Sequence, residues 1–322
     1  MGNIVVVDEQ FVAGFRGLSR DWPSPHHDVV LPDGWELDEL ASSLADADAL
    51  ITVHRRVDGH MLDLAPKLQV IARPGAGVDN VDVEAATARG VVVTNVLGAR
   101  GRAVAEHAWF LILYLMRRAW LRDDPAAWSV AVGDQLEGRT LGILGLGDIG
   151  QRVARIGASF GMDLVAHTRT PNPAVLPDLG VEFTDLDGCL RRSHVVVLCV
   201  PFDETTHGLI DRSRLAVMPR GSYLINVARG GVVVTDDLAD AIERGQIGGA
   251  GLDVTDPEPL AGDHRLRGLP NVIISPHVAG RSDRAQREAM ATLGANLAGL
   301  LDGGPVDSRA IVNPTALRRS SR

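Results

Sequence analysis

Short apolar runs recur along the chain, and they alternate with longer stretches in which apolar residues have helical spacing. Each run is apolar throughout, which is typical of strands that helices cover on both faces of a parallel sheet. The stretches between the runs are long enough to hold crossover helices. The pattern therefore predicts an α/β fold with strands near residues 4–7, 49–53, 70–72, 91–93, 141–144, 164–167, 195–200, 222–227, 249–253 and 272–275.

Two helical stretches are longer than the rest, at residues 103–121 and 283–301. A glycine-rich fingerprint lies in mid-chain, at residues 145–150, so a separate α/β unit must precede it. A chain of 322 residues is long enough for two domains. We expect the first long helix to lead into the second domain and the last one to cross back to the first.

Composition excludes several classes of protein. The formal net charge of −9 argues against a nucleic-acid partner, because such partners are bound by basic clusters. Cys189 and Cys199 are the only cysteines, too few for a disulfide framework or a paired-cysteine zinc site. The longest apolar run, residues 108–116, is far shorter than the roughly 18 residues that span a bilayer, and the N-terminus lacks a secretory pattern. We therefore expect a cytoplasmic protein without a membrane partner.

A G-x-G-x-x-G motif is formed by Gly145, Gly147 and Gly150, between an apolar strand and an amphipathic helix that opens with Asp148 and Ile149. The first glycine permits a tight turn, the second lets backbone amides approach a pyrophosphate, and the third lets helix and strand pack closely. A plain glycine-rich turn is the alternative. The flanking strand and helix favour a dinucleotide site.

The next strand ends at Thr168 and Arg169, where an NAD-binding domain would place a carboxylate for the ribose hydroxyls. A carboxylate would repel the 2′-phosphate of NADP, whereas Arg169 and Thr168 can bind it through charge-assisted hydrogen bonds. We predict that NADP(H) is preferred and that NAD(H) is possible. The alternative is that Arg169 only points into solvent and both cofactors serve equally.

Three later segments place charged side chains at expected strand ends: Arg229, Glu258 and His277. Loops after the carboxyl ends of strands line the ligand crevice of a doubly wound sheet. A guanidinium can bind a substrate carboxylate, and an imidazole can donate or accept the proton that accompanies hydride transfer, with Glu258 orienting the ring. Each residue alone has an ordinary structural explanation. Their order after a dinucleotide loop favours an oxidoreductase that needs no metal.

At these residues the chain resembles the D-isomer-specific 2-hydroxyacid dehydrogenase family, in particular its glyoxylate/hydroxypyruvate reductases. The matching stretches are PKLQVIARPGAGVDNVDVEAATARGVVVTN, AVAEHA, LGILGLGDIG, LINVARGG, LDVTDPEPL and SPHVAG. The resemblance implies two Rossmann-like doubly wound domains. One is a split substrate domain at residues 1–100 and 283–322, and the other is an inserted NAD(P)-binding domain at residues 101–282.

The resemblance also implies roles for individual positions. The catalytic residues would be Arg229, Glu258 and His277, and the substrate carboxylate would be received by the backbone of Gly75, Ala76 and Gly77. Asp253 would hold the nicotinamide amide, and Val104 would pack beside the ring. The other expected cofactor contacts are Val200, Pro201, Val227 and Ala228.

The activity so implied is hydride transfer between NAD(P)H and a 2-oxo acid or D-2-hydroxy acid, in a homodimer. Two alternatives stay open: a phosphoglycerate dehydrogenase without a regulatory domain, and a non-catalytic, dinucleotide-sensing protein of the corepressor type. Glu258 argues against the formate dehydrogenase branch, which usually has glutamine there. Aromatic and aliphatic residues within 109–120 would form either the dimer interface or the core of a single chain.

Arg55 lies in a cluster of cationic residues with His54, Arg56, Arg73 and Arg100. The simpler interpretation is a solvated basic surface. The sharper hypothesis is that Arg55 binds a second anionic group of the substrate, as in a dicarboxylate or a phosphorylated 2-oxo acid.

Overall fold

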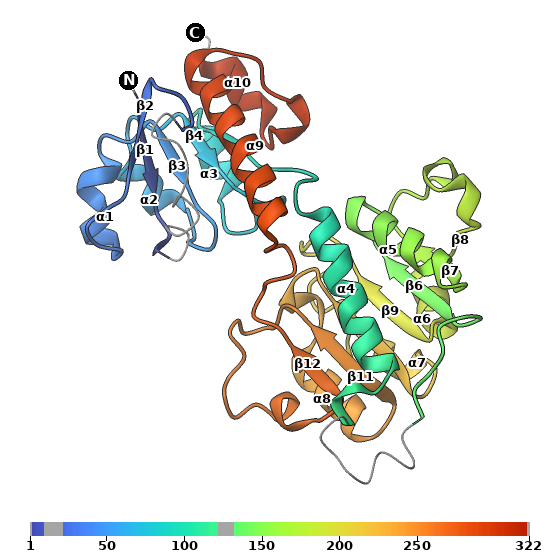
Figure 1. The fold of residues 1–322 in the computed structure, drawn as a ribbon. Coiled ribbons are helices and arrows are strands. Elements are labelled where there is room, and N and C mark those ends of the chain that lie inside the picture. The colour runs from blue at the N-terminus through green and yellow to red at the C-terminus, as the bar shows by residue number, and fades with distance from the viewer. Residues whose placement is uncertain (1, 10–21, 122–131, 321–322) are drawn as a thin grey trace. The chain divides into compact units, whose positions relative to one another are not determined.

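The computed structural model describes residues 2–9, 22–121 and 132–320, and it divides into two compact units. Unit 1 comprises Met1–Arg100 and Asp283–Arg322, and unit 2 comprises Gly101–Ser282. Each unit has its own parallel sheet with helices on both faces (Figure 1). The predicted α/β class with two doubly wound domains is confirmed.

The described part of unit 1 contains a five-stranded sheet in the order β2-β1-β3-β4-β5. Its strands are β1 (Gly2–Val6), β2 (His27–Val30), β3 (Ala49–Ile51), β4 (Val70–Ala72) and β5 (Val92–Thr94). Successive side chains point to opposite faces of a sheet. Val5 therefore packs with Leu50 in one apolar layer, while Val6 packs with Ile51 in the other.

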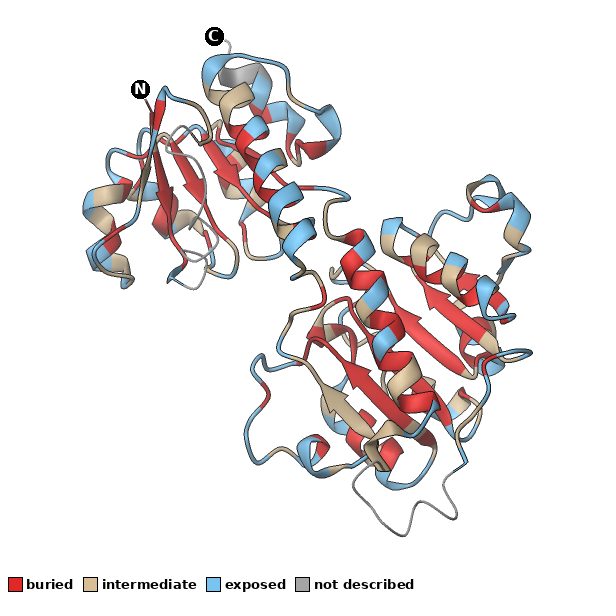
Figure 2. Cartoon of the chain, in the orientation of Figure 1, coloured by how far each residue is buried: buried red, intermediate tan, exposed pale blue. Residues whose placement is uncertain are grey.

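Helices cover both faces of this sheet. One face packs against α1 (Leu37–Leu44), α2 (Gly59–Asp63) and α3 (Val83–Ala88), and the other against α9 (Asp283–Asp302); α10 (Pro314–Ser320) ends the described chain. Met290, Leu293 and Leu297 are the buried side of α9, and Figure 2 shows exposed residues along its other side. The last long helix thus completes the core of the N-terminal sheet.

The described part of unit 2 contains a seven-stranded sheet in the order β12-β11-β10-β9-β6-β7-β8, all parallel. Its strands are β6 (Thr140–Leu144), β7 (Asp163–His167), β8 (Glu182–Phe183), β9 (Val195–Leu198), β10 (Ser222–Asn226), β11 (Ile247–Leu252) and β12 (Val272–Ile274). The order reverses between β6 and β9. In open parallel sheets such a reversal opens a crevice at the carboxyl ends of the strands, where ligands bind.

Two helical layers enclose the sheet of unit 2. One apolar layer includes α4 (Gly101–Met116) and α5 (Asp148–Ser159), and the other includes α6 (Leu186–Arg192), α7 (Arg212–Val217) and α8 (Thr235–Glu243). Neighbouring side chains of β6 show the alternation, because Ile143 joins the first layer and Leu144 the second. Both are fully buried, and burying such a side chain contributes about 1.5–3 kcal/mol.

All ten predicted strands are present, but two observed strands were not predicted. The missed strands are β2 and β8, which lie at the edges of their sheets and are only four and two residues long. The predicted helix at residues 103–121 was also too long. It ends at Met116 because Arg118 adopts a φ of 52°, and a 3-10 turn at Ala119–Leu121 follows.

Candidate active site and cofactor loop

The glycine loop joins β6 to α5. Gly145 has a φ of 93°, and a Cβ there would lie 2.7 Å from the carbonyl oxygen of Cys199. At Gly150 a Cβ would lie 2.1 Å from the carbonyl oxygen of Gly145. At Gly147 nothing lies within 4 Å of a Cβ, so the N-terminus of α5 is open to a ligand. Gly145 and Gly150 therefore allow the tight turn and the close packing of helix on strand, and Gly147 leaves space for a pyrophosphate.

The first residues of α5 are Asp148 and Ile149, as predicted. The Asp148 carboxylate is paired with Arg152, one turn along the helix, at 2.9 Å. An acidic residue near a helix N-terminus is favourable for the helix itself but adds negative charge where a phosphate would bind. The pairing with Arg152 offsets that charge.

Beyond β7, the chain continues through Thr168 to Arg169, and its end carries no carboxylate. The guanidinium of Arg169 is instead paired with a carboxylate from the loop after β9: its Nη1 lies 3.2 Å from Oδ2 of Asp203. Asp203 was not among the residues predicted from the sequence. Nothing in the sequence marks the contact, because the two residues are 34 positions apart.

The expected apolar cofactor contacts lie on three elements of unit 2. Val104 is nine-tenths buried on α4, Val200 and Pro201 follow β9, and Val227 and Ala228 follow β10. β9 and β10 are neighbours in the sheet, so both loops leave the same edge. Their role in binding a nicotinamide ring stays a prediction.

His277 and Glu258 form a direct pair. Nδ1 of His277 lies 2.6 Å from Oε1 of Glu258, and both side chains are partly exposed. The backbone of His277 has a φ of 53°, rare for a residue with a Cβ, and its N–H donates to the Asp253 carbonyl at 2.8 Å. Such strain persists only where the surroundings impose it, and it is concentrated at functional sites.

Arg229 follows β10, the strand beside β11. Its Nη1 donates to the carbonyl of Ala228 at 2.8 Å, and its own carbonyl accepts from Asn226 at 2.9 Å. The loop after β10 touches the loop after β11, since a Cβ at Gly230 would lie 2.0 Å from the carbonyl group of Thr255. The loops bearing Arg229 and Glu258 therefore meet at the carboxyl edge of the sheet.

Asp253 is 2% exposed and anchors the loop that carries His277. Its Oδ1 accepts from the hydroxyl of Ser275 at 2.6 Å and from the N–H of Val278 at 2.9 Å. Its Oδ2 accepts from the N–H of Ala279, also at 2.9 Å. These bonds occupy most of the carboxylate. Its predicted contact with the nicotinamide amide stays a prediction.

His107, on α4, extends this network. Its Nε2 lies 2.8 Å from Oγ of Ser275 and 3.5 Å from Oδ1 of Asp253. Because the Ser275 hydroxyl donates its one proton to Asp253, it must accept from Nε2–H of His107. No role for His107, in the stretch AVAEHA, was predicted from the sequence. Its partner Ser275 is 168 positions away, so the sequence does not show the contact.

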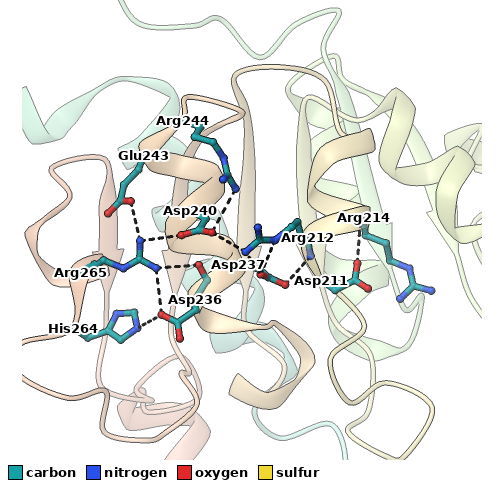
Figure 3. Close-up of polar contacts among 10 residues, drawn as sticks. All are labelled: Asp211, Arg212, Arg214, Asp236, Asp237, Asp240, Glu243, Arg244, His264 and Arg265. Carbon is teal, nitrogen blue, oxygen red and sulfur yellow. Dashed lines mark hydrogen bonds and ion pairs between the residues drawn. The ribbon is translucent and has the colours of Figure 1, made fainter.

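The segment between β11 and β12, which carries Glu258, is tethered to α8 by ion pairs (Figure 3). Arg265 contacts Asp240 at 3.0 Å and Glu243 at 2.9 Å. Asp240 also pairs with Arg212, at 2.8 Å, so the network reaches the start of α7. Each surface pair is weak alone, but shared partners reduce the entropy that each one loses.

In unit 1, Gly75, Ala76 and Gly77 form a loop whose carbonyl groups are turned inward. The carbonyl of Gly75 accepts from the N–H of Val96 at 3.2 Å, that of Ala76 from Asn95 at 2.8 Å, and that of Gly77 from Arg73 at 2.8 Å. Within the described residues, the three N–H groups of the loop have no acceptor. Backbone donors left together in this way suit an anion.

The guanidinium of Arg55 is used within unit 1. It donates to the carbonyl of Val7 at 2.8 Å and also to the carbonyl of Trp35. Arg100 similarly donates to the carbonyl of Pro74, at 3.0 Å. These contacts with backbone carbonyls favour a structural role for the cationic cluster around Arg55. Binding of a second substrate anion by Arg55 stays a prediction.

Neither a metal-ligating cluster nor a membrane-spanning helix occurs in the described ranges. Among residues 2–9, 22–121 and 132–320, no group of His, Cys, Asp and Glu side chains is arranged to hold a metal ion. In the same ranges, no helix combines the length and the apolar content that crossing a membrane requires.

Comparison with known proteins identifies the family of this chain. The family model for the NAD-binding domain of D-isomer-specific 2-hydroxyacid dehydrogenases matches residues 110–279. A glyoxylate reductase of Aeropyrum pernix is 37% identical over 314 residues, which cover 93% of each chain. A D-3-phosphoglycerate dehydrogenase of Mycobacterium tuberculosis is 41% identical over 263 residues, 80% of this chain but only 50% of that protein.

A solved structure agrees with the sequence relatives. The D-lactate dehydrogenase of Aquifex aeolicus, determined with NAD and lactic acid, superposes with a TM-score of 0.83 at 26% identity, covering 97% of this chain and 99% of that one. The expected resemblance is confirmed. The chain belongs to the D-isomer-specific 2-hydroxyacid dehydrogenase family of nicotinamide-dependent oxidoreductases.

Proposed function

We propose that this protein reduces a small 2-oxo acid to the D-2-hydroxy acid, with His277 as the proton donor. The observation that carries the proposal is the 2.6 Å contact between His277 and Glu258, at the strand edge where the glycine loop also lies. A bound nicotinamide dinucleotide supplies the hydride to the carbonyl carbon. The protein must then supply one proton and hold the substrate.

The proposed roles follow from hydrogen-bonding capacity. Nδ1 of His277 contacts Glu258, and we assign to the other ring nitrogen, Nε2, the proton given to the carbonyl oxygen or taken back in the reverse direction. Arg229 offers a planar fork that can bind the carboxylate and polarise the adjacent carbonyl. The amides of Gly75, Ala76 and Gly77, which have no acceptor among the described residues, are suited to receive a carboxylate.

For the cofactor we propose that NADP(H) is preferred and that NAD(H) is also used. Support comes from the end of β7, where Thr168 and Arg169 stand in place of a ribose-binding carboxylate. The proposed contacts of the ring and its amide are those of Val104 and Asp253. The proposed contacts along the dinucleotide are the glycine loop and the residues that follow β9 and β10.

For the substrate we propose a short 2-oxo acid such as glyoxylate or hydroxypyruvate. Support comes from the glyoxylate reductase relative, which matches this chain over 93% of its length. The retained Arg229, Glu258 and His277 disfavour a corepressor that works without turnover.

The direct experiment is an initial-rate assay of NADPH and NADH oxidation against glyoxylate, hydroxypyruvate, pyruvate, phenylpyruvate and oxaloacetate. We expect turnover with glyoxylate and hydroxypyruvate, faster with NADPH, and none in His277→Ala. Cofactor binding without turnover on any of these acids would favour the sensor instead. A strong preference for NADH would refute the cofactor assignment alone.

We also propose a homodimer. Trp109 and Leu111 belong to the core of unit 2, but Phe110 is 49% exposed and its ring lies 6.1 Å from that of Tyr114. An exposed phenylalanine beside a half-buried tyrosine on one helix is a suitable contact surface. Light scattering after size-exclusion chromatography should give twice the chain mass, and Phe110→Ser should lower it.

A further inference from the structure

Asp203 is held rigidly by its own loop. Its Oδ1 accepts from the N–H of Thr205 at 2.9 Å and from the Thr205 hydroxyl at 2.5 Å, while its N–H donates to the hydroxyl of Thr206 at 2.8 Å. These bonds leave Oδ2 for Arg169, at 3.2 Å. The carboxylate is about one third exposed and the guanidinium two thirds. Arg169 is thus the mobile partner and Asp203 the fixed one.

The ion pair between Arg169 and Asp203 joins the two loops on either side of the glycine loop. In the sheet, β7 and β9 lie on either side of β6, and all three strands are parallel. Arg169 leaves the carboxyl end of β7, and Asp203 lies in the loop that leaves the carboxyl end of β9. Their contact therefore joins the two loops that flank the end of β6, where Gly145 begins the dinucleotide motif.

We propose that Asp203 is a specificity-determining residue, which holds Arg169 by its carboxylate and opposes the 2′-phosphate of NADP(H). The proposal rests on the proposed use of a nicotinamide dinucleotide with Arg169 at its ribose. NADH leaves the ion pair intact. The 2′-phosphate of NADPH must share Arg169 with the fixed carboxylate of Asp203. The difference in affinity between NADPH and NADH is therefore smaller than it would be if Arg169 had no such partner.

The size of the effect follows from geometry. A phosphate oxygen bonded to Arg169 would lie within about 6 Å of the Asp203 carboxylate, because each anion sits about 3 Å from one guanidinium. Like charges at that separation in a solvent-exposed site change binding by a factor of several. The hydrogen bonds from Thr205, together with nearby Arg169, lower the pKa of Asp203, so it is ionised at neutral pH.

The test is a direct binding measurement that does not depend on turnover. Dissociation constants for NADPH and NADH are measured by tryptophan fluorescence on the whole protein, and those for 2′,5′-ADP and 5′-AMP by calorimetry. Asp203→Asn removes the charge but keeps an oxygen for Thr205. Glu204→Gln is the matched control, because it removes the same charge at an exposed neighbour.

We expect Asp203→Asn to tighten NADPH and 2′,5′-ADP by about 3- to 10-fold and to change NADH and 5′-AMP by less than about 2-fold. Glu204→Gln should change every constant by less than about 2-fold. Unchanged or weakened NADPH binding in Asp203→Asn, with 5′-AMP binding intact, would overturn the proposal, as would an equal effect of Glu204→Gln.

Arg169→Ala separates this proposal from the one it rests on. If Arg169→Ala weakens NADPH at least about tenfold while Asp203→Asn has no effect, the cofactor assignment stands and the role of Asp203 is wrong. If Arg169→Ala changes nothing, the assignment of the 2′-phosphate to Arg169 fails. Absence of turnover on every 2-oxo acid would count against the proposed reaction without touching these binding constants.

Discussion

Nδ1 of His277 lies 2.6 Å from Oε1 of Glu258, on a backbone whose φ of 53° is rare for a residue with a side chain. The contact fixes the direction of the imidazole ring. The strained backbone turns the side chain at the end of a short strand. Backbone strain of this kind is concentrated at functional sites, which supports the proposed role of His277 as the proton donor.

Removing this donor should abolish most of the activity. His277→Asn is expected to lower kcat by about 10²–10⁴-fold, the usual contribution of a positioned acid or base. Glu258→Gln, which keeps a hydrogen-bonding side chain but not the charge, should give a smaller loss. Steady-state rates with saturating NADPH and glyoxylate measure both. Binding of NADPH, followed by fluorescence, should be unchanged, and equal activity in His277→Asn and the unmodified protein would remove His277 from the mechanism.

Ser275 is expected to act through the loop of His277 and not on the substrate. Ser275→Ala breaks the chain from His107 to Asp253 and should lower kcat by about tenfold, with KM and the NADPH dissociation constant nearly unchanged. Ser275→Thr keeps the hydroxyl and should restore most of the rate. The pH profile of kcat/KM gives an independent readout, because a loop that only lost stability would keep the profile of the unmodified protein.

The amides of residues 75–77 are expected to bind the substrate carboxylate. Ala76→Pro removes one N–H donor and should raise KM for glyoxylate by about 10- to 100-fold, the loss of one charge-assisted hydrogen bond. Ala76→Ser, which keeps the donor, is the control. Thermal melting should show that both variants fold, and a KM that rises equally in the two would assign the effect to the side chain.

The ion pairs of Arg265 should contribute a modest, salt-dependent stability. Arg265→Ala is expected to lower Tm by about 1–3 °C at low ionic strength, and the difference should vanish in 1 M salt. Arg191→Ala, which breaks a single pair within α6, should have a smaller effect. Calorimetry of both variants at two salt concentrations makes the comparison, and a salt-independent loss would point to packing of the Arg265 side chain instead.

The sequence predicted what depends on local pattern. Buried strands are apolar throughout because helices cover both their faces, as at Ile143 and Leu144, so the continuous apolar runs located them. The glycine motif could be recognised from the sequence because the spacing of its three glycines follows from one tight turn between β6 and α5. The edge strand β2 was missed since it has a single neighbour and is only partly buried.

Contacts between distant segments could not be read in the same way. The bond between His107 and Ser275 depends on how α4 packs beside the end of β12, and the pair of Arg169 and Asp203 depends on strand order. The sequence also does not reveal where backbone carbonyls point, so the contacts of the Arg55 guanidinium within unit 1 could not be predicted. Two of these carbonyls accept hydrogen bonds from it.

The two units differ in whether one continuous stretch of coding sequence specifies them. Unit 2 is one uninterrupted stretch, Gly101–Ser282, and its sheet and both helical layers are encoded within it. Unit 1 needs α9 from beyond that stretch to cover the face of its sheet formed by Val6 and Ile51. Recombination could therefore transfer the coding sequence of unit 2 in one piece. Unit 1 would keep both faces of its sheet covered only if the coding sequences of its two segments were joined again.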